Sequence, residues 1–274
     1  MPVEFQSIPF ATYLAAPGLS SSFLRGMSRS PAHAKCAAES ERDSAQMLIG
    51  RALHCAVLEP SRYGESFRVG PCVDARTKAG KAEWAAFEAS CKPDTELLSP
   101  KEDDAVRGMS ASLRGHGLAR QLLFRDGVKT EQSIFWEHRG LTCKARIDCI
   151  TEFFGAPMVV DLKTTQNAGD FERSITKYGY HVQEAWYRRG LKAAGFTPER
   201  FMFIAVESTA PYGVAIYELD QAYLDAANAE IETNLATYAE CVKSGNWPGY
   251  KEEIRLVTCP VWLGEGAEEA SFAE

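Results

Sequence analysis

Several motifs that mark common kinds of site are missing from this sequence of 274 residues. Its eight cysteines include no C-x-x-C pair, which argues against a zinc ribbon or an iron–sulfur framework. Phosphate-loop, H-E-x-x-H and G-x-S-x-G patterns are also missing. The sequence therefore gives no indication of an ATP site, a zinc hydrolase or a serine hydrolase.

Long apolar segments are missing as well. No apolar run approaches the ~20 residues that a bilayer span needs. The N-terminal residues lack the basic start and apolar middle of a secretion signal. We therefore expect a cytoplasmic protein with reduced cysteines and no contact with a membrane.

The sequence has the composition of an ordinary globular protein, 45% hydrophobic and 24% charged. Its net charge of −7 is concentrated after residue 217, where twelve acidic residues accompany three basic ones. The rest is slightly positive, so the net charge does not exclude a nucleic-acid partner. We expect a single domain over 1–274, in which helices and turns (1–45) precede the core (46–250) and an acidic tail (251–274).

Periodic apolar residues predict helices over 46–59, 171–194 and 221–243, and Pro60 ends the first of them. A fourth helix is predicted over 99–124, because Ser99-Pro100-Lys101-Glu102 combines an N-cap serine, an early proline and a glutamate at the third helical position. Segments rich in β-branched and aromatic residues predict strands over 131–136, 141–151, 158–163, 201–207 and 214–219. This order predicts an α/β (α+β) fold with a central mixed β-sheet flanked by helices.

The sequence Asp161-Leu162-Lys163 is the most informative for chemistry. In a strand its first and third side chains share a face, which places a carboxylate beside an ammonium group. The preceding strand supplies Asp148. If the two strands pair, both carboxylates converge, as Mg²⁺ binding requires. A salt bridge alone is the commoner reason for such a pattern, so further residues are needed.

Four further residues support a site. His54 lies on the first helix, Glu131 on the strand before Asp148, and Gln183 with Tyr187 one turn apart on a later helix. Taken singly, His54 would be a core histidine and Glu131 a solvated strand carboxylate. Lys144 and Arg146 share a strand face with Asp148, where they would bind phosphates or neutralise carboxylates.

In this order, the motifs resemble the PD-(D/E)xK nuclease superfamily in its RecB-like branch. The segments L-I-G-R-A-L-H-C-A-V-L-E-P, L-T-C-K-A-R-I-D, V-V-D-L-K-T-T and Y-G-Y-H-V-Q-E-A-W-Y, which surround His54, Asp148, Asp161 and Gln183, are similar to the RecE-type (exonuclease VIII) phage recombination exonucleases. The resemblance covers about residues 19 to 250. It implies a restriction-endonuclease-like core over 46–250.

The resemblance also implies an activity. Such a protein would be an Mg²⁺-dependent 5′-to-3′ exodeoxyribonuclease, with Mn²⁺ able to substitute, that digests one strand of linear double-stranded DNA and leaves 3′ overhangs for a single-strand annealing protein. His54, Asp148, Asp161 and the Leu162 carbonyl would bind metal, and Lys163 would activate water. Gln183 and Tyr187 would form the Q-x-x-x-Y helix, and Glu131 would be a further carboxylate at the metal site.

The family's assembly implies a homo-oligomer, a tetrameric ring, around DNA. Two alternatives remain open on the sequence. One is a Cas4-like or endonucleolytic DNA-end-processing nuclease. The other is a non-catalytic DNA-end-binding module with the same fold.

Overall fold

The computed structural model describes residues 3–40, 44–74 and 76–259. Its centre is a five-stranded sheet in the order β3-β4-β5-β6-β7. The strands are β3 (Lys129–His138), β4 (Leu141–Phe153), β5 (Ala156–Thr165), β6 (Arg200–Glu207) and β7 (Val214–Glu218). Only β5 and β6 are parallel neighbours; the other pairs are antiparallel. This mixed sheet confirms the predicted fold class, and all five predicted strands are present.

Eleven helices and one small sheet surround or extend this centre within the described ranges. The helices are α1 (Phe10–Ala15), α2 (Ser21–Arg29), α3 (Pro31–Glu39), α4 (Ala45–Leu58), α5 (Pro60–Ser66), α6 (Lys78–Ser90), α7 (Pro100–Gly115), α8 (Gly117–Leu123), α9 (Phe171–Lys177), α10 (Tyr180–Ala193) and α11 (Gln221–Ser244). The small parallel sheet consists of β1 (Phe67–Val69) and β2 (Glu96–Leu98). None of these helices is both long and apolar enough to cross a membrane.

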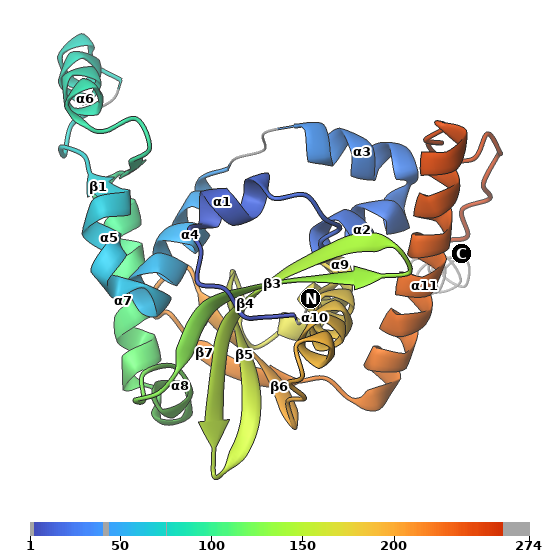
Figure 1. Ribbon diagram of the computed structural model, residues 1–274. Coiled ribbons are helices and arrows are strands. Elements are labelled where there is room, and N and C mark those ends of the chain that lie inside the picture. Colours follow the sequence, from blue (N-terminus) through green and yellow to red (C-terminus); the bar gives the residue numbers. More distant parts are fainter. Residues whose placement is uncertain (1–2, 41–43, 75, 260–274) are drawn as a thin grey trace, which may run out of the picture.

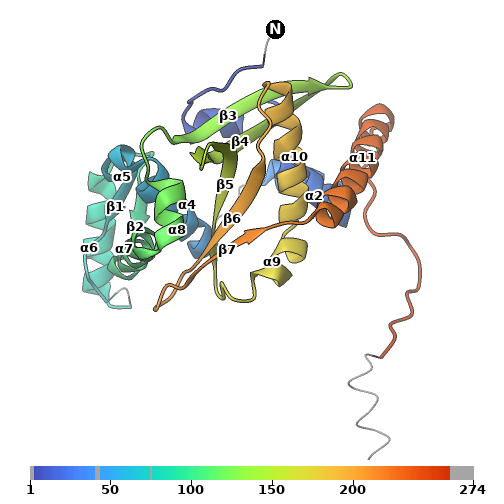
Figure 2. The same ribbon diagram turned by 90° about the horizontal axis from the view of Figure 1, so that it is seen from below.

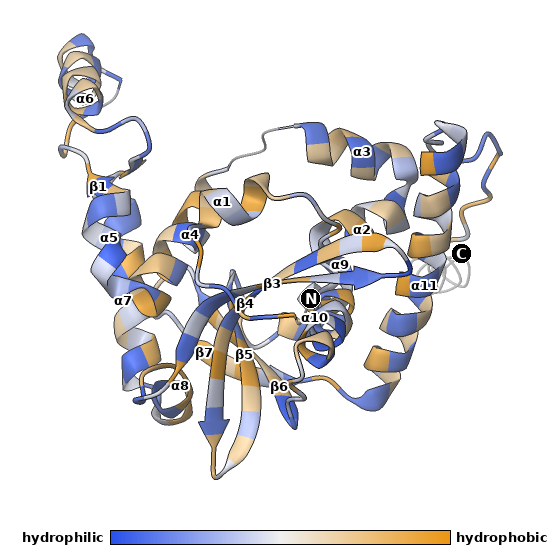
Figure 3. Cartoon of the chain, viewed as in Figure 1, coloured by the Kyte–Doolittle hydropathy of each residue, from blue (hydrophilic) through white to orange (hydrophobic). Residues whose placement is uncertain are grey.

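Two hydrophobic cores lie on the two faces of the sheet. One contains Trp186 of α10 and Ile231 of α11 against Phe203 of β6. The other contains Leu53 of α4 and Met109 of α7 against Val160 of β5. Figures 1 and 2 show α4, α7 and α8 on one side of the sheet and α10 and α11 on the other. Hydrophilic and hydrophobic segments alternate along these helices, as expected when one helix face is buried (Figure 3).

The N-terminal segment joins the edge of the central sheet. Gln6 forms an antiparallel bridge to Ser133 of β3, and Leu19 forms a parallel bridge to Cys143 of β4. Leu24 of α2 is fully buried in the same core as Trp186. The segment from Gln6 to Leu24 is therefore attached to the sheet and to the core on one of its faces.

The predicted helix 99–124 is in fact two helices. Its start is confirmed, because Ser99 and Glu102 form the reciprocal capping box. The helix ends at Gly115, and His116 caps α8 by accepting a hydrogen bond from the Ala119 N–H at Nδ1. The glycines on either side of His116 lower helix propensity at this point, which accounts for the break.

The predicted helix 171–194 is also interrupted. Gly179 separates α9 from α10 and has φ of +64°, a left-handed conformation that glycine adopts readily. A Cβ atom at Gly179 would lie 2.7 Å from Cδ of Arg25 on α2. The break thus allows α2 to approach the start of α10. Periodicity did not reveal it, because apolar residues continue on both sides.

Four elements were not predicted, namely α5, β1, α6 and β2. They form an arm in which α6 lies apart from the central sheet (Figure 1). Within this arm, Trp84 of α6 covers Gly70, where a Cβ atom would be 2.3 Å from the indole ring. The strands β1 and β2 are only three residues long, which explains why no strand pattern is visible in the sequence.

Candidate metal centre

The candidate site forms where β4 and β5 separate. Their pairing runs from Phe153–Ala156 to Cys149–Val160 and stops before Asp148 and Asp161. Beyond that point the Asp148 side chain, and not the backbone of β4, accepts the hydrogen bond from the Leu162 N–H, at 2.9 Å. Asp148 and Asp161 are 8% and 1% exposed, so both carboxylates are taken out of bulk water. The splay therefore brings two buried acids together.

Asp161 is held from two sides. Gln183 of α10 donates from Nε2 to Oδ1 of Asp161 at 2.7 Å. Lys163, two residues along the same strand, forms an ion pair with Oδ2 of Asp161. The predicted common face of Asp161 and Lys163 is thus confirmed, and Gln183 lies where it orients the carboxylate.

Lys163 is kept charged by its surroundings. Burial alone would lower the pKa of its ammonium group, but Asp161 and Asp148 raise that pKa above its ordinary value. Its Nζ also lies 5.0 Å from the ring centre of Tyr180, the first residue of α10. An ammonium held between a carboxylate and an aromatic ring keeps its charge and a defined position. Tyr180 was not among the predicted site residues.

His54 reaches the site from α4, which is anchored by the buried side chains of Leu53 and Val57. Its Nε2 lies 2.9 Å from the Leu162 carbonyl oxygen, so this nitrogen carries the proton and donates. Nδ1 lies 3.6 Å from the Asp148 carboxylate. Burial would lower the pKa of His54, but Asp148 and Glu131 raise it to about 9. The imidazole is therefore the positive partner of the acids.

Glu131 stands opposite Asp148 on the neighbouring strand β3. Its carboxylate lies 3.8 Å from Nδ1 of His54 and forms an ion pair with Arg146. Burial would raise its pKa, yet His54 and Arg146 lower that pKa below the ordinary value. Glu131 also has φ of +52°, which costs a non-glycine residue roughly 1–2 kcal/mol. Glu131 thus combines a strained backbone conformation with an ionised carboxylate at the site.

The donor groups fit a divalent metal ion. One ligand atom each from His54, Glu131 and Asp148 all lie within 4.8 Å of one another. The pKa of Asp148 is raised to about 7, first by burial and next by the charge of Asp161. A cation would relieve this repulsion, and oxygen donors with one imidazole suit Mg²⁺ or Mn²⁺. The structure therefore brings Glu131 fully into the candidate ligand set.

Arg146 and Lys144, which the sequence placed on the face of Asp148, behave differently. Arg146 binds Glu131 and also donates to the carbonyl of Ile8 at 2.7 Å. Lys144 instead donates to the carbonyl oxygens of Tyr13, Leu14 and Ala16, at the end of α1. Arg146 thus neutralises a site carboxylate, whereas Lys144 fixes the N-terminal segment.

Tyr187, one turn after Gln183, is buried beneath the site. Its ring centre lies 6.3 Å from that of Phe201, and the side chain is 9% exposed. Burial, followed by the charge of Asp161, raises its pKa well above the ordinary value. Tyr187 is therefore neutral, and it lies close to Gln183 and Asp161.

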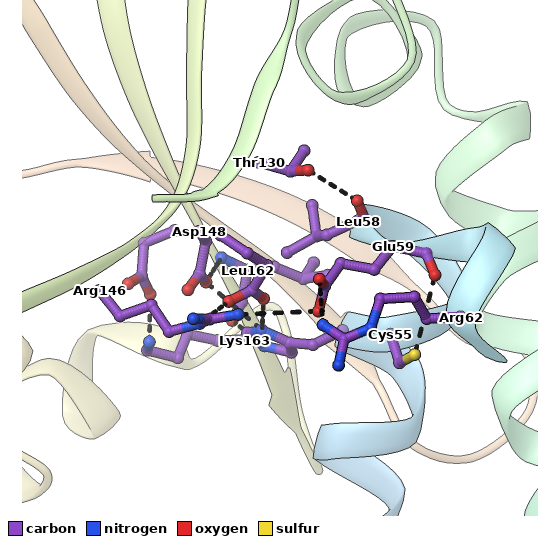
Figure 4. Close-up of polar contacts among 12 residues, drawn as sticks. Cys55, Leu58, Glu59, Arg62, Thr130, Arg146, Asp148, Leu162 and Lys163 are labelled. Carbon is purple, nitrogen blue, oxygen red and sulfur yellow. Dashed lines mark hydrogen bonds and ion pairs between the residues drawn. The ribbon is translucent and has the colours of Figure 1, made fainter. Parts of the chain in front are cut away.

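Sequence reasoning missed Glu59 and Arg62, which face the site from the end of α4 and the start of α5. Glu59 forms an ion pair with Arg62 at 2.6 Å and lies 3.7 Å from Arg146. Figure 4 shows this pair opposite Asp148, Leu162 and Lys163. The available signal was the position of Glu59, five residues after His54 and directly before Pro60.

Comparisons with known proteins address the fold. A family model described as "PDDEXK-like domain of unknown function (DUF3799)" matches residues 20–259. The solved structure of a "Putative exonuclease" from Eubacterium rectale has a TM-score of 0.63 at 13% identity, covering 95% of this chain and 98% of that chain. A phage related exonuclease from Haemophilus somnus covers 65% of this chain and 91% of its own at 12% identity, with a TM-score of 0.34. No curated protein matches the sequence.

Proposed function

The chain belongs to the family of PDDEXK-like domains described as DUF3799, and from this membership and the site geometry we propose that it is a divalent-metal-dependent nuclease. The observation that supports the activity is the splay of β4 and β5, which places Asp148 and Asp161 beside Lys163 and His54. Membership in this family agrees with the superfamily that the sequence motifs indicated.

In the proposed reaction, His54, Glu131 and Asp148 would hold the metal, joined by Asp161 and the Leu162 carbonyl. When bound, a divalent ion supplies Lewis acidity for water and neutralises charge on the phosphoryl group. Nδ1 of His54 faces Asp148 and Glu131, so metal binding there would require the loss of any proton on Nδ1, while Nε2 would keep its hydrogen bond to the Leu162 carbonyl. Gln183 would continue to orient Asp161 through the 2.7 Å hydrogen bond.

Lys163 would act by charge and by hydrogen bonding. Its ammonium group is fixed by Asp161 and Tyr180, so it would donate to the attacking water or to a phosphoryl oxygen without reorganisation. Because its pKa is raised, Lys163 would not serve as the resting-state base. It would orient water and offset the negative charge that develops during phosphodiester cleavage.

The finer proposal follows the resemblance to RecE-type exonucleases. We propose that the protein uses Mg²⁺, with Mn²⁺ as a substitute, and digests linear duplex DNA from the 5′ end to leave 3′ overhangs. A homo-oligomeric ring, tetrameric by that resemblance, would hold the duplex. A single-strand annealing protein would receive the overhang, and this would place the activity in phage recombination.

The test compares linear duplexes labelled at the 5′ or 3′ end with nicked and closed circular DNA, each with Mg²⁺ and with EDTA. We expect early release of the 5′ label from the linear duplex, survival of the 3′-labelled end, and an intact closed circle. Cutting of the closed circle would favour an endonuclease, and digestion of single strands alone would favour a Cas4-like enzyme. Binding to ends with no cleavage under any metal would favour the non-catalytic module.

A further inference from the structure

A hollow lined by arginines lies away from the metal centre. Its volume is about 520 Å³, and its lining residues are Arg114, Arg120, Gln121, Phe124 and Arg125, from the end of α7, from α8 and from the turn that follows. The lining contains no carboxylate. Within the described part of the chain, none of its three arginines forms an ion pair, although the protein as a whole carries a net charge of −7.

The side chains that line the hollow favour an anionic ligand. The guanidinium carbon of Arg114 lies 4.1 Å from the ring centre of Phe124, so the guanidinium is held against the aromatic ring. An arginine held in this way keeps its N–H groups available to a phosphate. Arg120 and Arg125 are exposed and add two further positive charges around the same space.

A second feature stands beside the hollow, at the hairpin between β4 and β5. Arg125 donates to the Glu152 carbonyl of this hairpin, and Cys149 contacts the Leu122 carbonyl of α8 at 3.7 Å. Figures 1 and 2 both show α8 next to the end of β4. The tip of the hairpin and the arginines are therefore neighbours.

The hairpin tip carries Phe154, which is 92% exposed. Phe154 and Gly155 form a two-residue turn with φ of +52° and +81°. Such a turn strongly favours asparagine or glycine at the position of Phe154. Phe154 thus has the backbone strain of a left-handed residue and gains little burial, so folding alone does not account for it.

We propose that the arginine hollow and Phe154 form a secondary binding site for single-stranded DNA, with arginines on phosphates and Phe154 stacked on a base. This ligand identity rests on the proposed function; the hollow itself does not. Single-strand sites combine positive grooves with aromatic stacking platforms in this way. Along β4, Glu152 lies four residues from Asp148, or roughly 13 Å, so a short stretch of single strand would reach from the hollow to the candidate metal centre.

The test measures binding without cleavage, by fluorescence anisotropy of a labelled oligo-dT in EDTA. We expect the triple variant Arg114→Gln, Arg120→Gln, Arg125→Gln to bind at least about tenfold more weakly, with a salt slope shallower by about 2. The matched control removes three exposed lysines elsewhere, Lys192→Gln, Lys243→Gln and Lys251→Gln, and should bind within about twofold of wild type. Equal loss in both variants, or no loss in either, would overturn the proposal.

Phe154→Asn tests stacking separately, because asparagine suits this turn and should raise the melting temperature. Binding of oligo-dT should nevertheless fall by about fivefold or more. An abasic oligonucleotide should bind wild type and Phe154→Asn equally. Unchanged oligo-dT affinity in Phe154→Asn would contradict the stacking role.

Cleavage with Mg²⁺ is measured on the same proteins to separate the two proposals. If wild type does not cleave DNA but its binding of oligo-dT depends on the three arginines, the proposed nuclease activity is wrong and the proposed binding site stands. If wild type cleaves DNA but neither the triple arginine variant nor Phe154→Asn binds oligo-dT more weakly, the proposed binding site is wrong and the proposed nuclease activity stands.

Discussion

Lys163 is the residue whose charge constrains the chemistry most. Its ammonium group is paired with Asp161 and lies over Tyr180, and its pKa is raised, so it is protonated at neutral pH. A residue in that state stabilises negative charge and orients water. Removing the charge should therefore affect the chemical step more than DNA binding.

We expect Lys163→Met to lower the rate of DNA cleavage by about a hundred- to a thousandfold, with affinity for DNA within about threefold of wild type. Single-turnover cleavage and metal-free binding assays measure the two quantities. Lys177→Met is the matched control, since Lys177 is exposed on α9. If Lys163→Met cleaves DNA at the wild-type rate, Lys163 has no role in the chemical step.

Glu184, next to Gln183 on α10, is a buried acid outside the proposed ligand set. It is fully buried, one of its carboxylate oxygens has no hydrogen-bond partner in the described structure, and the other accepts from Arg188 at 2.8 Å. Burial raises its pKa from 4.5 to about 7, although Arg188 opposes this. The folded protein thus retains a proton that the unfolded chain loses between these pH values.

This shift predicts how stability depends on pH. The stability that protonated Glu184 contributes is fully present below about pH 4.5 and is lost as pH rises to about 7. Relative to Glu184→Gln, wild type should lose about 3 kcal/mol of unfolding free energy over this range and nothing further above it. Denaturant unfolding at several pH values measures the difference, with the exposed Glu172→Gln as control. A difference that does not vary with pH would contradict this account.

At the scale of elements, the site depends on how α10 meets the splayed strands. Gly179 starts α10 in a left-handed conformation and lies against Arg25 of α2. This contact fixes the start of the helix that presents Gln183 to Asp161. A side chain at Gly179 would push the two helices apart.

We expect Gly179→Ala to destabilise the fold by roughly 2 kcal/mol or more and to reduce cleavage, because it combines left-handed strain with a steric clash. Gly195→Ala is a matched control at the other end of α10. Gly195 also has positive φ, +75°, but no atom lies near its added Cβ. It should cost about 1 kcal/mol and leave activity unchanged. Equal effects of both substitutions on activity would exclude the proposed role of the contact.

Much of the fold was predictable because its patterns are local. Alternation predicted all five central strands, and Ser99 with Glu102 marked the start of α7. The break at Gly179 was not predictable, since its cause is contact with Arg25, distant in sequence. The ordered motifs and their resemblance to a nuclease superfamily grouped His54, Asp148 and Lys163 at one site. They did not indicate Tyr180, Glu59 or Arg62. Those residues join the site through helix ends, where no periodic pattern exists.

At the scale of the whole molecule, negative charge is segregated toward the C-terminal part of the sequence. The described part of the 251–274 segment, up to residue 259, has no helix or strand, and the remainder lies outside the described residues. The central sheet carries the candidate metal centre, and the arginine hollow lies near the hairpin between β4 and β5.

The ring proposal predicts a defined mass in solution. Light scattering coupled to size-exclusion chromatography should give four times the chain mass of 30.2 kDa. Subunit exchange or dilution should then reduce processive digestion of long duplexes more than cleavage of short ones. A monomer that digests long duplexes without dissociating would contradict the ring.

The most direct test of the metal-dependent site is the rate of nucleotide release from end-labelled linear duplex as Mg²⁺ is titrated, for wild type and Asp148→Asn. We expect wild type to show no release in EDTA and a saturable rise with Mg²⁺. Asp148→Asn should remain folded but require far more metal or release nothing. Release by wild type in EDTA, or identical Mg²⁺ curves for both proteins, would contradict the assignment of the site.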